Sequence, residues 1–448
     1  MKHLISIFLL AIIMIALPLH LRFAHNNPTI AGTEPYYHAR IAMQLSEFNF
    51  EDNSIVNGRQ YKISPYHIVL AFGYKIIGPL TFKIFPAIFA FAGFVFFWLL
   101  LRKLNIEHDT QSWMLLAYAL SPPLMTAGMV GTPHAFVLAL LTAGSILLLS
   151  RWWAIGTAFF IIASLSGRVY NVAAIVFLIF FMLITKRTTQ LKLTTLLSVA
   201  TLIIGYTPAS TEKQMALSQY ISDFGGMYGL SIFALLLAIV GAALVWEHKK
   251  VYYGAYALVV ATLVASYFLP DLLIFSNIII SALAGIALKK LSQRKWELHF
   301  LRHAALLVLF CGLLFSSIAH AVSLADIPPT KNFFKSLEFP PGTILSHEQY
   351  GFWIELAGHK AVLDLLWKEL SNSEEQKWDA AALFASAELA KAQPLLAKYN
   401  ITHILITPEM KHGLLWEREQ QGLDFLVENN EMFKKRETGS NIGVWKVR

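Results

Sequence analysis

The sequence has little charge and almost no cysteine. Only 14% of its 448 residues are charged, whereas 56% are hydrophobic. An ordinary soluble domain carries about 25% charged residues, so this composition places the chain among membrane proteins. The single cysteine, Cys311, lies inside an apolar run. An intrachain disulfide and a cysteine-based metal site are therefore excluded.

The basic residues gather in short clusters between apolar runs. The formal net charge of +8 could suggest a nucleic-acid partner, but clusters of this kind are typical of cytoplasmic loops. We therefore expect the lipid bilayer, and no nucleic acid, as a partner. The first apolar run follows Met1-Lys2-His3 and shows no small-residue cleavage site, which predicts an uncleaved helix with a cytoplasmic N-terminus.

Apolar runs of about 17 to 25 residues are long enough to cross a bilayer. With the N-terminus in the cytoplasm, the basic clusters after the even-numbered runs, such as Arg102-Lys103 and Lys289-Lys290, fall on the cytoplasmic side. We count about eleven such runs. They lie near 4–21, 84–102, 111–129, 134–150, 152–167, 169–185, 193–207, 228–246, 252–269, 271–288 and 301–323.

The composition changes after the last run, which predicts two domains. Residues 1–323 form a multi-pass membrane domain with outer loops at 22–83 and 208–227, and 324–448 form a soluble extracytoplasmic α/β domain. In this second domain Ile401 to Ile406 and Gly443 to Val447 are predicted strands, and Trp378 to Gln393 a helix that ends before Pro394. The run Tyr66 to Ile77 is too short to span, so we expect a helix lying on the membrane.

Several ionisable residues fall on the outer side in this topology, where such groups usually line a substrate or ion path. Two carboxylates and a histidine can hold Mg²⁺ or Mn²⁺, which would neutralise a phosphate leaving group, and a carboxylate can deprotonate an acceptor. We interpret the set as one site. Its members are Glu34, His38, Arg40, His134, Glu212, Lys213, Asp271, His347, Glu348 and Gln349.

Each of these residues also has an ordinary explanation when taken alone. Glu34 and Glu212 are acids in loops, where acids normally lie. His134 follows Thr132-Pro133, an ordinary helix entry, and Asp271 follows Pro270 at a helix start, where the helix dipole favours a carboxylate. Only their order along the chain is specific.

That order resembles the catalytic subunit of oligosaccharyltransferase, a member of the C-type glycosyltransferase superfamily. The stretch GTEPYYHAR at 32–40 is similar to the first acidic motif of this family, and TAGMVGTPH at 126–134 lies where the family has its second acidic pair. TEKQ at 211–214 resembles the family's loop glutamate. The stretch LSHEQYGFWI at 345–354 occupies the place of its WWDYG motif.

The resemblance implies a polytopic C-type glycosyltransferase fold of about 11 to 13 helices and a polyprenyl-(pyro)phosphate-linked saccharide as donor. It implies that Glu34 and Glu212 are catalytic, that Glu34 and His134 bind Mn²⁺ or Mg²⁺, and that the acceptor is a protein or peptide. Acceptor contacts would come from Glu212 and from the segment that matches WWDYG, which holds His347, Glu348, Gln349 and Tyr350.

The chain departs from the family pattern at three places. His134 and Phe136 replace the second acidic pair, and His347, Glu348 and Gln349 replace the residues that recognise the sequon hydroxyl. The family's arginine near the late helices has no counterpart. Its contact with the donor phosphate would then fall to Arg40, Arg168 or Lys213.

Four hypotheses therefore stay open. The first is an oligosaccharyltransferase-type enzyme that glycosylates a protein at the outer face. The second is a transferase that uses a polyprenyl-monophosphate sugar and a non-sequon acceptor, with Glu34 as general base. The third is an inactive paralogue that binds lipid or glycan, and the fourth is a transporter or flippase.

Overall fold

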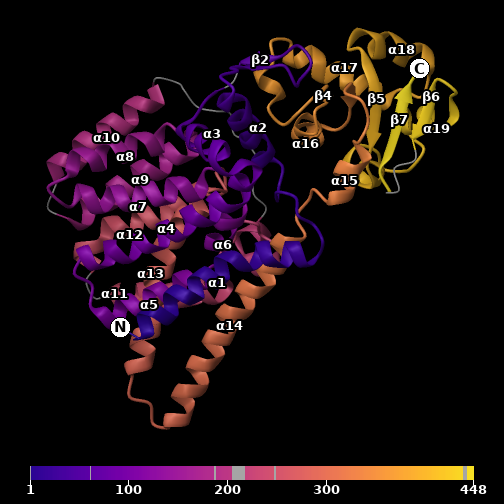
Figure 1. Cartoon of the computed structure of the whole chain (residues 1–448). Coiled ribbons are helices and arrows are strands. Elements are labelled where there is room, and N and C mark those ends of the chain that lie inside the picture. The colour runs from indigo at the N-terminus through magenta and orange to yellow at the C-terminus, as the bar shows by residue number, and fades with distance from the viewer. Residues whose placement is uncertain (1, 61, 186–187, 204–216, 247–248, 437–440) are drawn as a thin grey trace. The chain divides into compact units, whose positions relative to one another are not determined.

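The computed structural model describes residues 2–60, 62–185, 188–203, 217–246, 249–436 and 441–448. The chain divides into two compact units (Figure 1). The membrane unit comprises Met1–His25 and Ser64–Ile327. The second unit, named the outer unit after the side of the membrane expected from the sequence, comprises Asn26–Ile63 and Pro328–Arg448. This division differs from the expected one because residues 26–63 of the first loop fold together with the C-terminal region rather than with the membrane helices.

The membrane unit is a bundle of helices in which α4 packs against α7, and α13 packs against both α5 and α11. Buried small residues allow close approach: a Cβ at Gly285 of α13 would lie 2.4 Å from Met114 Cα of α5. The helices are α1 (Lys2–Ala24), α3 (Pro65–Ile77), α4 (Thr81–Lys103), α5 (His108–Ala119), α6 (Pro122–Met129), α7 (His134–Leu148), α8 (Trp153–Ser164), α9 (Arg168–Ile184), α10 (Thr188–Ile203), α11 (Ile232–Val245), α12 (Lys249–Ala265), α13 (Leu272–Gln293) and α14 (His299–Ala325).

Every apolar run predicted from the sequence contains a helix, but many of these helices are short. In the described part of the chain, four helices are long and apolar enough to cross a membrane, or up to five if the pair α6 and α7, bent by 115°, counts as one span. The run 111–129 is divided into α5 and α6 because Pro122 and Pro123 cannot continue a helix that ends at Ala119. The helix expected at Tyr66 to Ile77 is present as α3.

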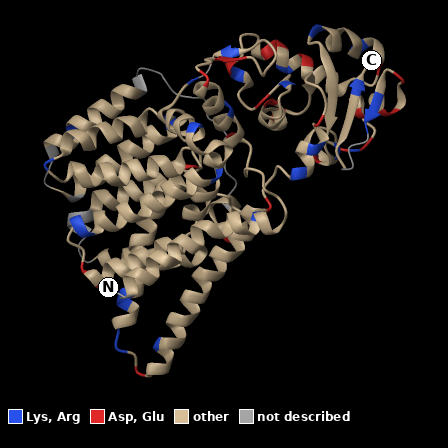
Figure 2. Cartoon of the chain, viewed as in Figure 1, with Lys and Arg blue, Asp and Glu red and all other residues tan. Residues whose placement is uncertain are grey.

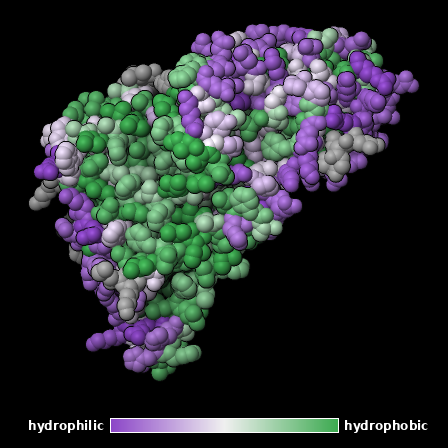
Figure 3. All heavy atoms as spheres, in the orientation of Figure 1, coloured by the Kyte–Doolittle hydropathy of each residue, from purple (hydrophilic) through white to green (hydrophobic). Residues whose placement is uncertain are grey.

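The surface of the membrane unit suits a lipid environment. Apolar side chains cover the face shown in Figure 3, and large exposed ones lie on several helices, including Ile13, Ile239 and Phe315. Lysines and arginines in this unit lie near helix ends rather than along them (Figure 2). Large exposed apolar surfaces of this kind are rare on soluble monomers. The chain is therefore a multi-pass membrane protein, as predicted.

The outer unit contains a five-stranded sheet in the order β4-β3-β5-β7-β6. Strands β3 (Thr343–Leu345), β4 (Lys360–Ala361) and β5 (Ile401–Ile406) run parallel, whereas β7 (Gly443–Val447) is antiparallel to β5 and to β6 (Phe433–Arg436). The strands predicted at 401–406 and 443–447 are confirmed. Residues 54–56 pair with Ala361 of β4, where the Ala361 amide donates to the Ser54 carbonyl at 2.9 Å. The first loop thus extends the edge of this sheet.

Short helices surround the sheet. The single helix predicted over 378–393 is wrong: α17 ends at Ala385, and α18 continues past Pro394, which lies inside it. Ser386 separates the two because its amide bonds to the Leu383 carbonyl and its hydroxyl to the Glu388 carbonyl. The remaining elements of the unit are α2 (Glu34–Ser46), β1 (Glu51–Asp52), β2 (Arg59–Gln60), α15 (Lys331–Ser336), α16 (Gly351–Leu356), α17 (Ser373–Ala385), α18 (Leu389–Lys398) and α19 (Gly422–Asn429).

Candidate functional site

Glu34 is the first residue of α2 in the outer unit. Gly32 before it has a positive φ of 89°, a conformation that glycine adopts without strain, and Pro35 in the first turn favours helix initiation. The Glu34 side chain is 48% exposed, and its Oε1 lies 3.2 Å from Nε2 of His38, which is 6% exposed. The spacing of four residues puts both groups on one helix face, so a half-exposed carboxylate is oriented by a buried imidazole.

The two tyrosines of the same stretch attach α2 to α16. Tyr36 stacks on Phe334 with ring centroids 5.5 Å apart and meets Trp353 of α16 edge-on at 6.4 Å. The Trp353 indole donates a hydrogen bond of 3.2 Å to the Gly32 carbonyl, and Tyr37 packs against Phe352 at 5.1 Å. Two motifs that lie more than 300 residues apart in the sequence are therefore brought into contact.

The segment before α16 is the one expected to contact the acceptor, and two of its four residues are already engaged. Glu348 forms an ion pair with Lys377. The Tyr350 hydroxyl is buried, bonds to Thr407 Oγ1 at 2.8 Å, and its pKa is raised to about 12 by burial. His347 caps the short helical turn 348–350, its Nδ1 accepting the Gln349 amide at 3.3 Å. His347, Glu348 and Gln349 are all partly buried, and an acceptor contact by this segment stays a prediction.

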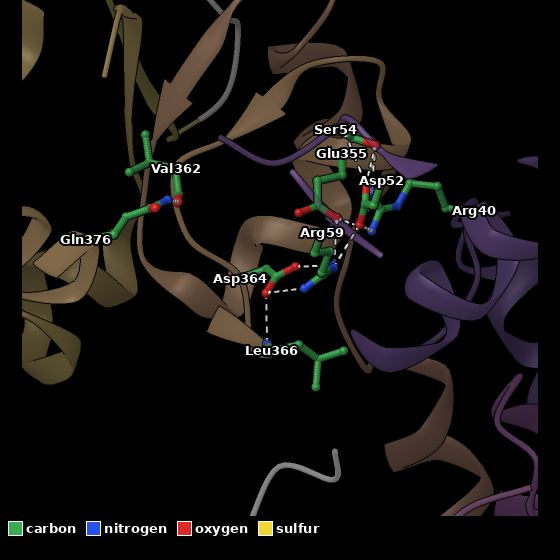
Figure 4. Close-up of polar contacts among 9 residues, drawn as sticks. All are labelled: Arg40, Asp52, Ser54, Arg59, Glu355, Val362, Asp364, Leu366 and Gln376. Atoms are coloured by element: carbon green, nitrogen blue, oxygen red, sulfur yellow. Dashed lines mark hydrogen bonds and ion pairs between the residues drawn. The ribbon is translucent and has the colours of Figure 1, made fainter. Parts of the chain in front are cut away.

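Arg40 does not match the role of a phosphate ligand that the sequence suggested. Its side chain is 4% exposed and lies in a buried ion-pair network (Figure 4). It binds Asp52 of β1 through both terminal nitrogens, and its Nη2 lies 2.6 Å from Glu355 Oε2 of α16. A phosphate could reach Arg40 only if these contacts broke, so the structure supports a structural role for this residue.

Arg59 of β2 completes the same network. Its Nε donates to Asp52 at 2.9 Å, and its Nη1 donates to Asp364 at 3.0 Å. Burial works against the charge of Arg59, yet the carboxylates of Asp364, Glu355 and Asp52 raise its pKa. Burial alone would raise the pKa of Asp52, but Arg40 and Arg59 hold it below its usual value. The helix that carries Glu34 is thus connected to α16 through this buried network of ionisable groups.

His134 lies in the membrane unit, as the first residue of α7, and is 1% exposed. Its Nε2 lies 3.2 Å from Asp271 Oδ1, a residue at the start of α13, and Nδ1 contacts the Thr132 hydroxyl. The ring stacks on Tyr228 at 5.4 Å and meets Tyr170 of α9 edge-on at 5.5 Å. Both ring nitrogens therefore lie near polar atoms, but among the described residues Nε2 makes no well-aligned hydrogen bond, so the two tyrosines and Thr132 contribute most to holding the ring.

Arg168 is exposed and begins α9, two residues before Tyr170. An arginine at a helix N-terminus is disfavoured by the helix dipole. The contacts of His134 with Tyr170 and with Asp271 bring the N-terminal ends of α7, α9 and α13 together. Converging N-terminal ends favour a bound anion, and Arg168 adds a full positive charge at the same end of the bundle.

The loop before α11 leads to this group of residues. Tyr228 of the loop stacks on His134, and the Met227 carbonyl accepts from Thr126 Oγ1 at 2.7 Å. Asp223 accepts from the Ser316 hydroxyl and, at 2.9 Å, from the Ile232 amide. Residues 217–231 are thus fixed to α6, α11 and α14. The predicted catalytic Glu212 and its neighbour Lys213 lie outside the described residues.

The predicted metal ion does not fit the donors of either unit taken by itself. Throughout the residues that the structure describes, no three His, Cys, Asp or Glu side chains form a group that could hold a metal. Glu34 with His38 and His134 with Asp271 each provide two donors, whereas Mg²⁺ takes about six ligands in near-ideal octahedral geometry.

Sequence reasoning missed several residues that organise the site. Asp52, Arg59, Glu355 and Asp364 were not singled out, and no local motif marks them, because the pairs that join the first loop to the C-terminal region, such as Arg59 with Asp364, are 305 residues apart. His38 was noted only as a polar residue. Its spacing of four residues from Glu34 was a signal that could have identified the pair.

Comparisons with known proteins show the fold but do not show a family. No protein-family model matches the chain, and no curated protein matches its sequence. The structure is similar to that of the *Archaeoglobus fulgidus* oligosaccharyltransferase tethered with an acceptor peptide containing the NVT sequon, with a TM-score of 0.67, 12% identity, and coverage of 100% of this chain and 74% of that one.

Two further likenesses agree with this result. The archaeal oligosaccharyltransferase AglB from *Archaeoglobus fulgidus* in complex with an inhibitory peptide and a dolichol-phosphate gives a TM-score of 0.65, at 12% identity and with 100% and 74% coverage. ArnT from *Cupriavidus metallidurans* gives 0.52, at 11% identity and with 97% of each chain covered. The chain therefore has the fold of polytopic membrane glycosyltransferases with a C-terminal domain, as its sequence predicted.

Proposed function

We propose that this protein is a membrane glycosyltransferase that transfers a saccharide from a polyprenyl-linked phosphate or pyrophosphate donor to an acceptor at the outer face of the membrane. One observation carries the proposal. The structure packs α2, which begins with Glu34, against α16, which follows the segment His347 to Tyr350. Two motifs selected from the sequence by resemblance are thus neighbours in space, within a glycosyltransferase fold.

Glu34 is proposed as the general base. Its half-exposed carboxylate accepts the proton of the acceptor nucleophile while the bond from the sugar carbon to the phosphate oxygen breaks and the bond to the acceptor forms. His38, buried and 3.2 Å away, orients the carboxylate. General-base catalysis by a positioned side chain contributes about 10² to 10⁴ in rate. Glu212 is proposed to assist from the loop that precedes the described residues 217–231.

The departing phosphate needs positive charge. Arg168 and the N-terminal ends of α7, α9 and α13, which the contacts of His134 bring together, are proposed to supply it. Fixed dipoles and cations aimed at developing charge stabilise a leaving group without reorganisation. Lys213 is a further candidate from the sequence, whereas Arg40 is not retained.

The acceptor is proposed to be a protein or peptide, which is what the resemblance to oligosaccharyltransferase implies. A polyprenyl-monophosphate donor with a non-sequon acceptor is the second candidate. It is favoured by the engagement of Glu348 with Lys377 and of the Tyr350 hydroxyl with Thr407, because two residues of the segment that replaces the sequon-recognition motif are already bound within the outer unit.

The test is transfer in vitro by the purified full-length protein. Lipid-linked saccharides with mono- and diphosphate carriers serve as donors, sequon peptides and a mixed set of other acceptors are offered, and each reaction runs with and without Mn²⁺. Glu34→Gln is compared with Glu47→Gln, which neutralises an exposed acid just after the same helix. We expect at least a hundredfold loss of transfer in the first variant, from the base contribution cited above, and wild-type rates in the control.

The outcomes separate the hypotheses. Transfer to sequon peptides that Glu34→Gln abolishes supports the oligosaccharyltransferase-type enzyme. Transfer to other acceptors alone supports the second candidate. No transfer from any donor contradicts the proposal and leaves an inactive, lipid- or glycan-binding paralogue, while movement of lipid-linked sugar across a vesicle membrane without transfer would indicate a flippase.

A further inference from the structure

The buried network of the outer unit has more acids than bases. Three carboxyl groups and two guanidinium groups meet there, and all five side chains are at most 4% exposed. If all five were ionised, one negative charge would be left over in a site with almost no water, where an unpaired charge is very costly. One carboxyl group must therefore keep its proton. The five residues are Arg40, Asp52, Arg59, Glu355 and Asp364.

Glu355 is the group that keeps it. Asp52 accepts from both arginines and from the Ser54 amide, and Asp364 accepts from Arg59 and from the Leu366 amide at 2.8 Å. Among the described residues, neither oxygen of Glu355 accepts a well-aligned hydrogen bond. Its neighbours include two other acids, so its ionised form is the least supported of the three.

Among the residues that the structure describes, the groups that interact with Glu355 include no cation besides Arg40 and Arg59. Helix α2 contributes Arg40 and the buried Tyr37, strands β1 and β2 contribute Asp52 and Arg59, and the segment after β4 contributes Asp364. The electrostatic interactions of these groups add only Glu369, another acid. An ionised Glu355 would thus have to share two arginines that already pair with Asp52 and Asp364.

We propose that Glu355 is a positioning residue, a neutral carboxylic acid that holds α2 on α16 and so fixes Glu34 relative to the segment His347 to Tyr350. The effect of Glu355 on catalysis rests on the proposed function. The contact is direct, because Arg40 of α2 lies 2.6 Å from Glu355 of α16. Loss of the proton adds a third carboxylate beside Asp52 and Asp364, and the attachment of α2 weakens.

The pH dependence of the outer unit's stability follows from the direction in which folding shifts the pKa of Glu355. Burial raises the pKa of Glu355 well above its usual 4.5, with Asp364 adding to the effect and Arg40 opposing it. The folded protein therefore holds a proton that the unfolded chain releases. The stabilisation is complete below about pH 4.5, the unfolded value, and is lost as pH rises toward the folded pKa.

The experiment compares wild type, Glu355→Gln and the control Glu338→Gln in the full chain. Gln has the shape of the protonated acid, whereas Glu338 is an exposed acid of the same unit. Hydrogen-exchange protection of the α2 amides and transfer activity are each measured against pH. In wild type and the control, α2 protection should fall by up to tenfold per pH unit between about pH 4.5 and the pKa of folded Glu355, and the transfer rate should fall as folded Glu355 ionises.

Glu355→Gln should remove this dependence, leaving α2 protected and transfer active at alkaline pH. The proposal is overturned if the variant keeps the slope of wild type, or if it exposes α2 at every pH. Transfer that is absent from wild type contradicts the proposed function alone, because the protection profile of α2 still decides whether Glu355 positions the helix.

Discussion

The two units bury polar groups in opposite ways. In the membrane unit most buried polar side chains are neutral, and hydroxyls such as those of Thr142 and Ser145 bond to carbonyls one turn back in their own helices. In the outer unit five ionisable side chains are buried together. Figure 2 shows the same contrast in the spread of charged residues. The kind of polar group that each unit buries therefore corresponds to its expected surroundings, lipid for the membrane unit and water for the outer unit.

Because of this contrast, different features indicate functional residues in the two units. A bilayer penalises ionised groups, so the contact between buried His134 and partly exposed Asp271 in the membrane unit stands out against an apolar background. Charge is common in the outer unit, and there the informative feature is which charged groups remain accessible. Glu34 is half exposed, whereas Arg40 on the same helix is fully engaged.

Breaking the buried network should have the largest effect on stability. Arg59→Met removes the partner of Asp364 and one partner of Asp52. Removing one member of a buried ion pair costs about 3 to 5 kcal/mol. We expect a loss of that size for the outer unit, measured by hydrogen exchange at the amides of β3 and β5 in detergent-solubilised protein.

The membrane unit provides the control for this variant. Exchange at α4 and α7 should not change, since Arg59 lies in the outer unit. A loss below about 1 kcal/mol, the value typical of exposed pairs, would show that the network is open to water and would contradict the contrast between the units.

A second prediction concerns packing in the membrane unit. Gly285→Ala puts a methyl group 2.4 Å from the Met114 backbone, so α13 and α5 must move apart. Overpacking of this kind costs about 1 to 3 kcal/mol. Gly93→Ala is the matched control, because its Cβ would lie 3.4 Å from Leu138 Cγ, an ordinary contact. Thermal unfolding in detergent should show a lower midpoint for the first variant only, and equal midpoints would argue against close packing of α5 and α13.

The helices and the central strands could be predicted from the sequence because their signals are local. Apolar runs mark α1, α4, α13 and α14, and alternating apolar residues mark β5 and β7. The placement of 26–63 with the C-terminal region could not be predicted. It depends on pairings such as Arg59 with Asp364 and residues 54–56 with Ala361, which carry no periodicity and connect distant parts of the chain.

The candidate site was predicted in part for the same reason. Glu34 and the segment His347 to Tyr350 were found through resemblance, and the structure connects them through Tyr36 and Trp353. For Arg40 the structure favours a structural role over the one suggested, because a sequence does not show that an arginine is already paired. The roles of Glu212 and Lys213 stay predictions.

The prediction with the smallest expected effect concerns an ion pair near the surface of the outer unit. Lys62 and Glu369 form an ion pair of 2.7 Å between the first loop and the C-terminal region, the same two segments that the buried network connects, but the lysine is 41% exposed. Exposed pairs contribute about 0 to 1 kcal/mol because water and salt screen them. Lys62→Met should therefore change the exchange of β3 and β5 little, and high salt should remove what change there is. A loss as large as that of Arg59→Met would mean that the connection between the two segments, rather than the burial of charge, sets the stability of the unit.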